Sequence, residues 1–94
     1  MSAFTTRVEL HNAAFNDYTE LHAAMERRQF HRVIQSDGGQ LFHLPTAEYD
    51  SHGDLGIGDV LELAKAAANE TGKSASIIVT EAVRRQWFNL NQVK

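Results

Sequence analysis

The chain has 94 residues, no cysteine and a net charge of −3 at pH 7 when histidine is neutral. This length fits one domain over residues 1–94 that buries roughly 60–65% of the surface of the unfolded chain. Without cysteine there are no disulfides, no thiolate catalysis and no Cys-ligated zinc. The acidic balance argues against a general nucleic-acid binder, and we expect no DNA binding.

Neither the N-terminus nor the apolar runs predict contact with a membrane. The first residues read Met-Ser-Ala-Phe-Thr-Thr-Arg and contain no apolar signal region. No apolar run is long enough to cross a bilayer. We therefore expect a cytoplasmic protein with no membrane partner, and the residues indicate no cofactor.

The first third of the chain predicts a strand followed by a helix. Strict alternation of apolar and polar residues is typical of a strand with one buried face, here over residues 4–11. The predicted buried positions are Phe4, Thr6, Val8 and Leu10. Asp17 with Glu20 has the spacing of a capping pair, so a helix is predicted from Asp17 to Arg28–Gln29.

The stretch from Phe30 to Tyr49 predicts a β-hairpin. Asp37-Gly38-Gly39 separates two short β-type runs, and glycine reaches the positive φ of such turns without steric cost. Pro45 cannot donate to a ladder, so regular pairing should end there. The residues that follow, Asp50–Gly58, hold three of the six glycines and predict a mobile loop.

The last third predicts a second helix and one or two further strands. The helix is expected over about Asp59–Thr71, with Gly72 at the left-handed position that ends it. The β-branched run within Ser74–Glu81 predicts a strand. Residues 82–85 are expected to turn the chain, and Gln86–Leu90 predicts a short extra strand.

The order of these elements is β-α-β-β-α-β. It is the order of a ferredoxin-like α+β sandwich, an antiparallel sheet backed by two helices. In that arrangement the hairpin supplies one edge strand and one central strand of the sheet. A short C-terminal strand would be added to it.

Basic residues gather in sequence between the first helix and the hairpin. Guanidinium groups bind phosphate bidentately, and an imidazole acts as general acid or base near neutral pH. The cluster therefore predicts an RNA site, and its members are His22, Arg27, Arg28, His31 and Arg32. The alternative is structural: Arg27 and Arg28 complement the helix dipole in solvent, while His22 packs on the sheet.

Two other groups of residues give weaker indications of function. Arg84 and Arg85 form a second basic spot that either contacts RNA or is solvated at a turn. Glu9 and His11 would meet His43 if the hairpin paired with the first strand, which makes a three-ligand metal site conceivable. No histidine pair has the spacing of a dedicated metal site, so we predict no metal ligand.

The whole chain resembles small proteins related to GhoS, the antitoxin of type V toxin-antitoxin systems. The similarity is carried by the helix exit from Met25 to Phe30 into RVIQSDGG, and by the hairpin DGGQLFHLPTAEY. It implies a bacterial protein with the fold of a group of small CRISPR-associated proteins. It also implies cleavage of the messenger RNA of a small membrane toxin.

The resemblance also bears on the mechanism. Alignment on Met25 and Phe30 puts His22 where the family has a basic residue on the first helix. Asn12 stands where the related CRISPR-associated proteins have an aspartate that could hold a metal. We therefore predict metal-independent RNA cleavage, with His22, Arg28 and His31 as the catalytic residues. The predicted RNA-binding residues are Arg27, Arg32, Arg84 and Arg85.

An alternative function needs no catalysis. A small domain with an exposed sheet edge can pair with a second copy of itself, and the Trp87-Phe88 segment offers an apolar contact. In this interpretation the chain is a prophage-borne interaction module that forms a homodimer. The amino-acid pattern leaves the two functions open.

Overall fold

The computed structural model describes all residues from Met1 to Lys94. Its elements follow one another as β1 (Ser2–Leu10), α1 (Phe15–Glu26), β2 (Val33–Gln35), β3 (Leu41–His43), β4 (Glu48–Gly53), α2 (Ile57–Asn69) and β5 (Ala75–Ala82). The prediction of a small α+β domain with antiparallel strands and two helices is confirmed. Neither helix is long and apolar enough to cross a membrane.

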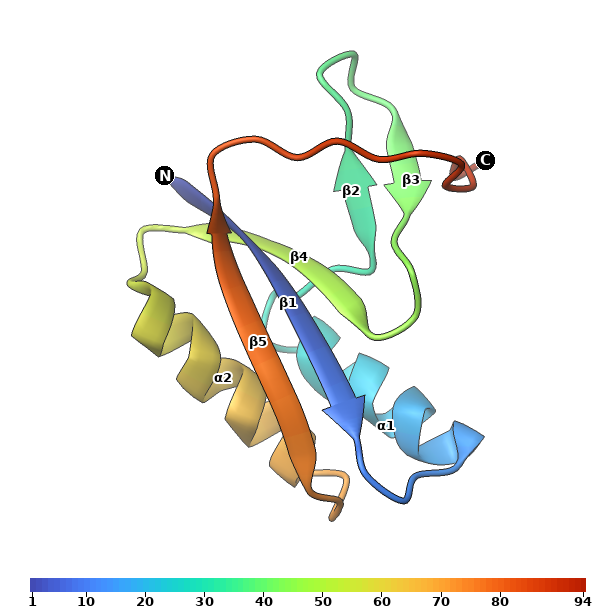
Figure 1. The fold of residues 1–94 in the computed structure, drawn as a ribbon, viewed down its shortest axis with the longest axis vertical. Helices are drawn as coiled ribbons and strands as arrows, with labels where there is room; N and C mark the ends of the chain where they lie inside the picture. Colours follow the sequence, from blue (N-terminus) through green and yellow to red (C-terminus); the bar gives the residue numbers. More distant parts are fainter.

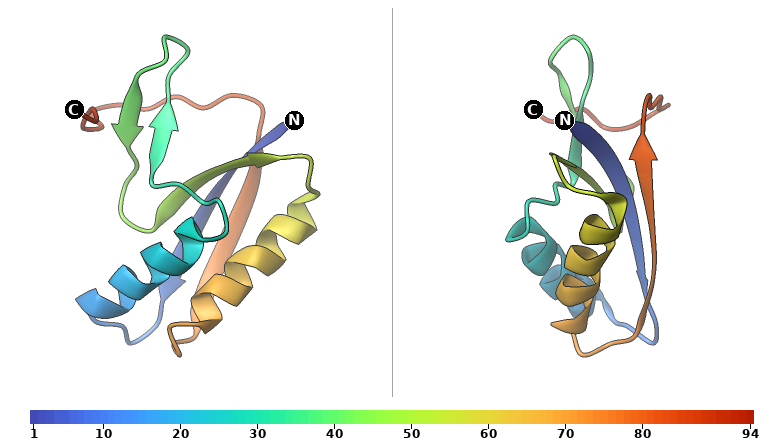
Figure 2. Two further views of the ribbon diagram at one scale, coloured as in Figure 1. Left: turned by 180° about the vertical axis from the view of Figure 1, so that it is seen from behind. Right: turned by 90° about the vertical axis from the view of Figure 1, so that its left-hand side faces the viewer.

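Three strands form the main sheet, in the order β4-β1-β5, and both pairings are antiparallel. Both helices lie against the same face of this sheet, so the other face is open (Figures 1 and 2). The alternation predicted for the first strand is confirmed, because its four predicted positions are all buried beneath the helices. Every second residue of β1, from Thr5 to Glu9, therefore lies on the open face.

The core lies between the main sheet and the helices. Its largest fully buried side chains include Phe4 from β1, Leu21 and Met25 from α1, Phe30, and Tyr49 from β4. Helix α2 adds mostly small residues, namely Val60, Ala64, Ala67 and Ala68. Small side chains let α2 approach the sheet closely.

Both helices begin two residues earlier than the sequence predicts. Asp17 and Asp59 lie at the third helical position, where each carboxylate accepts a hydrogen bond from a backbone N–H at the helix start. The donors are Ala14 N at 2.8 Å and Gly56 N at 3.2 Å. Each aspartate still satisfies a free amide, but from inside the first turn. The C-terminal prediction is confirmed, since Gly72 adopts a φ of +75°.

The hairpin forms as predicted but pairs only with itself. Strands β2 and β3 make a separate two-stranded sheet, and Gly39 takes a φ of +86° in the turn between them. The prediction that the hairpin supplies an edge and a central strand of the main sheet is wrong. The central strand is β1, and its neighbour is β4, which begins after Pro45 and the left-handed Ala47.

The predicted loop over Asp50–Gly58 is also wrong in its first half. Asp50 to Gly53 belong to β4, and Tyr49, Asp50 and Ser51 are buried. The glycines suggested mobility, but long-range pairing with β1 orders this segment. His43 lies on β3 and not beside β1, so the conceivable metal site with Glu9 and His11 is not assembled.

The predicted extra strand over Gln86–Leu90 is replaced by an irregular segment. We call residues 83–93 the C-terminal strap, which runs from the end of β5 across to β3 (Figure 1). Its far end pairs with β3, where His43 N donates to Asn91 O and Val93 N donates to Leu41 O, both at 2.8 Å. Trp87 packs on Phe42 with ring centroids 5.6 Å apart.

Candidate functional site

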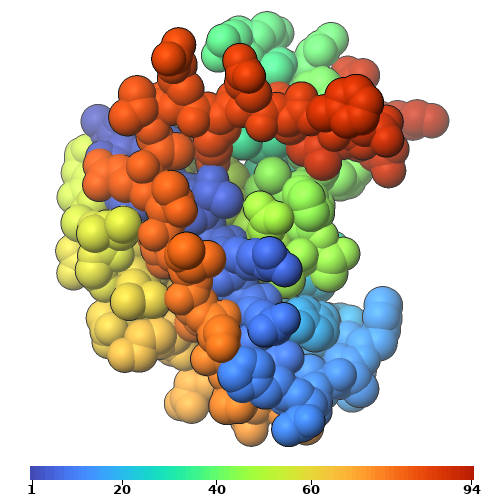
Figure 3. Space-filling view, viewed as in Figure 1, coloured from blue at the N-terminus to red at the C-terminus, as the bar shows by residue number.

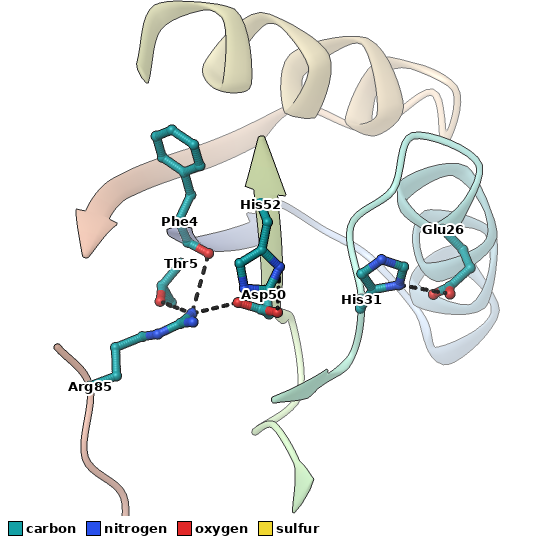
Figure 4. Close-up of polar contacts among 7 residues, drawn as sticks. All are labelled: Phe4, Thr5, Glu26, His31, Asp50, His52 and Arg85. Atoms are coloured by element: carbon teal, nitrogen blue, oxygen red, sulfur yellow. Dashed lines mark hydrogen bonds and ion pairs between the residues drawn. The ribbon is translucent and has the colours of Figure 1, made fainter. Parts of the chain in front are cut away.

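A buried carboxylate lies on the open face of the main sheet. The side chain of Asp50 is only 6% exposed, and Arg85 Nη1 lies 2.7 Å from its Oδ1. The same Nη1 contacts Thr5 Oγ1 at 3.1 Å and the Phe4 carbonyl at 3.4 Å (Figure 4). A desolvated carboxylate is costly unless paired, so this ion pair fixes the C-terminal strap on the sheet.

Two histidines lie near Asp50. His52 Nδ1 lies 3.5 Å from Asp50 Oδ2, and His31 Nδ1 lies 3.4 Å from Glu26 Oε1. Their side chains are 48% and 42% exposed, so both rings reach solvent. His31 also exchanges two backbone hydrogen bonds of 2.7 Å with Asp50, which makes His52 its diagonal neighbour across the strands. In Figure 4, His31 lies on the other side of β4 from Arg85.

A cleft of about 1100 Å³ opens between the C-terminal strap and the hairpin. Its lining includes Ala3, Gln35, Arg84, Arg85 and Trp87, and the space-filling view shows the strap arching over the hollow (Figure 3). Ala3 is the register partner of His52, so the cleft adjoins the histidine. Arg85 uses only Nη1 for its contacts, which leaves Nη2 and Nε without protein partners.

The first predicted basic cluster is not assembled into one site. Arg27 and Arg28 both bind Glu70 at the end of α2, with a nitrogen–oxygen distance of 2.5 Å in each pair. These hydrogen bonds, first that of Arg28, lower the pKa of Glu70. The two guanidiniums thus join the C-terminal ends of the two helices. Their role is structural, as in the alternative that they complement the helix dipole.

His22 is held inside the fold. Its Nδ1 lies 2.6 Å from the hydroxyl of Tyr49, a residue that is fully buried. Burial lowers the pKa of His22 from its ordinary 6.5, and the nearby positive charge of Arg32 lowers it further. Burial likewise raises the pKa of Tyr49. The imidazole is therefore neutral at neutral pH and acts as a hydrogen-bonding partner of the core.

The structure thus brings together only part of what was predicted. His31 and Arg85, which lie 54 positions apart in sequence, meet at Asp50, while Arg84 stays exposed at the cleft. Sequence reasoning missed Asp50 and His52, which it assigned to a mobile loop. The one available signal was the spacing of Asp50 and His52, since residues two apart share a face of a strand.

Histidine and carboxylate groups do not gather elsewhere. His11 contacts Ser76 Oγ at 2.9 Å and Ser74 Oγ at 3.2 Å. No group of three or more His, Asp or Glu side chains has the geometry to hold a metal ion. On the open face, the imidazoles can transfer protons and the guanidinium of Arg85 can bind anions.

The ion pair predicts a stability effect. Arg85→Ala should lower the free energy of unfolding by about 3 kcal/mol, because it leaves the Asp50 carboxylate buried without its cation. Arg84→Ala is the matched control, since Arg84 is exposed and makes no ion pair; its effect should stay within about 0.5 kcal/mol. Urea unfolding followed by far-UV circular dichroism measures both. Equal effects would contradict the structural role of Arg85.

The lowered pKa of His22 predicts acid sensitivity. The unfolded chain takes up the proton near pH 6.5 and the folded chain only at lower pH. The free energy of unfolding should therefore fall as the pH is lowered from 6.5 towards the folded-state pKa. His22→Asn keeps a hydrogen-bonding atom near the position of Nδ1 and should make this fall shallower. Identical pH profiles of the two proteins between pH 7 and 5.5 would exclude this role.

Comparison with known proteins gives this site no ready assignment. The chain matches no protein-family model and no curated protein. Its function is therefore inferred from the side chains that the fold brings together.

Proposed function

We propose that the protein is a GhoS-like antitoxin that cleaves RNA without a metal ion, with His31 and His52 as its acid–base pair. The observation that carries the proposal is the pair of half-exposed histidines, each beside a carboxylate, near the Asp50–Arg85 ion pair. The resemblance of the sequence to GhoS-related proteins supports the choice of RNA as substrate.

The spacing of the two histidines suits a phosphodiester. Diagonal neighbours in an antiparallel pair have Cα atoms about 7–8 Å apart. We propose that one phosphodiester binds between the two rings, with an imidazole within hydrogen-bond reach, about 2.6–3.2 Å, on each side. Arg85 lies at the His52 end of this pair, and its Nη2 and Nε have no protein partners, so they are the donors proposed to stabilise charge on the phosphate oxygens.

The proposed reaction is an internal transesterification. One imidazole takes the proton of the 2′-hydroxyl, and the 2′-oxygen forms a bond to phosphorus. The bond from phosphorus to the 5′-oxygen breaks, and the other imidazole, protonated, gives its proton to that oxygen. The products are a 2′,3′-cyclic phosphate and a 5′-hydroxyl. In this scheme the carboxylates of Glu26 and Asp50 orient the two rings.

The finer fold assignment belongs to the same proposal. We infer a ferredoxin-like arrangement in which the bridge between His31 and Asp50 takes the place of a fourth strand beside β4. The order would then be β5-β1-β4 followed by the segment at His31, with two helices on one face. This segment leaves the main sheet after one residue pair, and the chain continues into the β2–β3 hairpin.

The proposed acid–base pair predicts a loss of cleavage. His31→Ala and His52→Ala should each reduce the rate of RNA cleavage about 100-fold to 10,000-fold, the usual contribution of acid–base catalysis. His43→Ala, an exposed histidine on β3, is the matched control and should cleave like the unaltered protein. The assay incubates purified protein with structured and single-stranded RNAs, with and without EDTA, and maps the product ends.

Cleavage that resists EDTA and ends in 2′,3′-cyclic phosphates supports the mechanism. If the double variant Arg28→Ala, His22→Ala stays folded but loses cleavage, the catalytic site lies instead on helix α1. Intact RNA in the presence of the unaltered protein would refute the ribonuclease proposal.

A second candidate function, a non-catalytic homodimer, is favoured by the free edge of β5. This eight-residue strand pairs with β1 on one side only and carries a single charged residue, Glu81. Long exposed edges of this kind pair with other strands unless charges or bulges prevent it. Antiparallel pairing of two copies about Ile78, 63% exposed, would place Ile77 opposite Val79 of the second copy.

Light scattering tests the homodimer. If β5 mediates it, the mass of the unaltered protein should rise towards twice the monomer mass with concentration, while Ile78→Lys remains monomeric because two lysines would face each other. Leu55→Lys introduces the same charge at another half-exposed apolar residue and should still dimerise. A constant monomer mass for the unaltered protein would exclude the homodimer.

A further inference from the structure

The cleft beneath the C-terminal strap combines the groups that bind an unpaired nucleotide. Trp87 packs against Phe42 and also lines the cleft. Arg84 is exposed and makes no ion pair, so its guanidinium is free at the same cleft. Phe88, the next residue after Trp87, is 91% exposed. Bases stack on aromatic rings, and guanidinium groups bind the phosphates between them.

The strap is held in place at both ends, so its exposed side chains are presented in a defined position. Arg85 fixes one end to Asp50, and the other end pairs with β3. Between these anchors, Phe88 cannot pack into the core of its own chain. A large exposed aromatic and a free cation on one anchored segment mark a binding surface for a partner that offers flat rings and negative charge.

We propose that this cleft binds one unpaired nucleotide of single-stranded RNA, with a neighbouring base stacked on Phe88 and a phosphate on Arg84. This inference rests on the proposed RNA cleavage and names its substrate class. The cleft volume of about 1100 Å³ exceeds the 300–1000 Å³ typical of pockets for small ligands, so a nucleotide fits within it.

The polar lining suits a base more than a second phosphate. The amides of Gln35 and Gln86 offer both donors and acceptors for the edge of a base. Asp37 also lines the cleft, and a carboxylate accepts hydrogen bonds from the amino group of a base but repels a phosphate. In double-stranded RNA the base edges are paired and the faces are stacked, so a duplex cannot enter.

The cleft also adjoins the proposed acid–base pair. Ala3 lines the cleft and is the register partner of His52. Arg85 also lines the cleft and takes part in the proposed catalytic site. A nucleotide held in the cleft would therefore place an adjoining phosphodiester near the histidines. Because the two sites are close, the nucleotide bound in the cleft would determine which phosphodiester bond is cut.

The single tryptophan makes the cleft directly observable. Because Trp87 is the only tryptophan of the chain, its fluorescence reports on this cleft alone. The probe is an eight-nucleotide 2′-O-methyl oligoribonucleotide with a fluorescein at one end, which cannot be cleaved because its 2′-oxygens are blocked. Trp87 emission and fluorescein anisotropy are followed in the same titration, with the duplex of the same sequence as comparison.

Saturable change of Trp87 emission by the single strand, and not by the duplex, is the expected result. Phe88→Ala should weaken binding about fivefold or more, the loss of one base–aromatic stack. Arg84→Ala should weaken it and reduce the slope of its salt dependence by about one. The controls are Phe15→Ala, which removes a phenylalanine that is 89% exposed on α1, and Arg7→Ala, which removes an exposed cation of β1.

Failure of this inference is distinguishable from failure of the proposed ribonuclease. Anisotropy that reports binding while Trp87 emission stays constant, or while Phe88→Ala binds unchanged, overturns the cleft site only. Absence of binding together with EDTA-resistant cleavage of natural RNA also overturns the cleft site and leaves the ribonuclease. Absence of both binding and cleavage overturns both.

Discussion

The buried carboxylate of Asp50 requires a neutralising cation, and the arrangement of the open face depends on how that cation is supplied. It lies on a strand whose other face is covered by helices, and its own side chain is 6% exposed. A charge so far removed from water needs a cation, and only Arg85 supplies one at 2.7 Å. Because Arg85 comes from the C-terminal strap, the ion pair also decides where the last eleven residues before Lys94 lie.

The position of the strap in turn creates the cleft. From its anchor at Asp50 the strap runs to β3, where backbone hydrogen bonds and the contact of Trp87 with Phe42 hold it. The hollow between strap and hairpin is thus bounded by two segments far apart in sequence. The same ion pair keeps His52 beside a carboxylate, so the orientation of one proposed catalytic group depends on a residue of the strap.

The histidines divide into structural and accessible ones according to their neighbours. His22 faces the core and binds the hydroxyl of a fully buried tyrosine, which keeps it neutral. His31 and His52 keep about half of their side chains in solvent beside carboxylates. The guanidiniums divide in the same way. Glu70 occupies Arg27 and Arg28, whereas Arg84 has no partner.

Sequence alone determined the features that depend on neighbours in the chain: the alternation of β1, the two helices, and the turns at Gly39 and Gly72, where glycine adopts positive φ. His31 and Arg85 were recognised as candidates, but their partner Asp50 was not, because a glycine-rich segment resembles a loop until β1 pairs with it. Tertiary structure alone decided strand partners, ion pairs and burial. These depend on contacts between distant residues, and a local pattern carries no information about which distant residue will neutralise a charge.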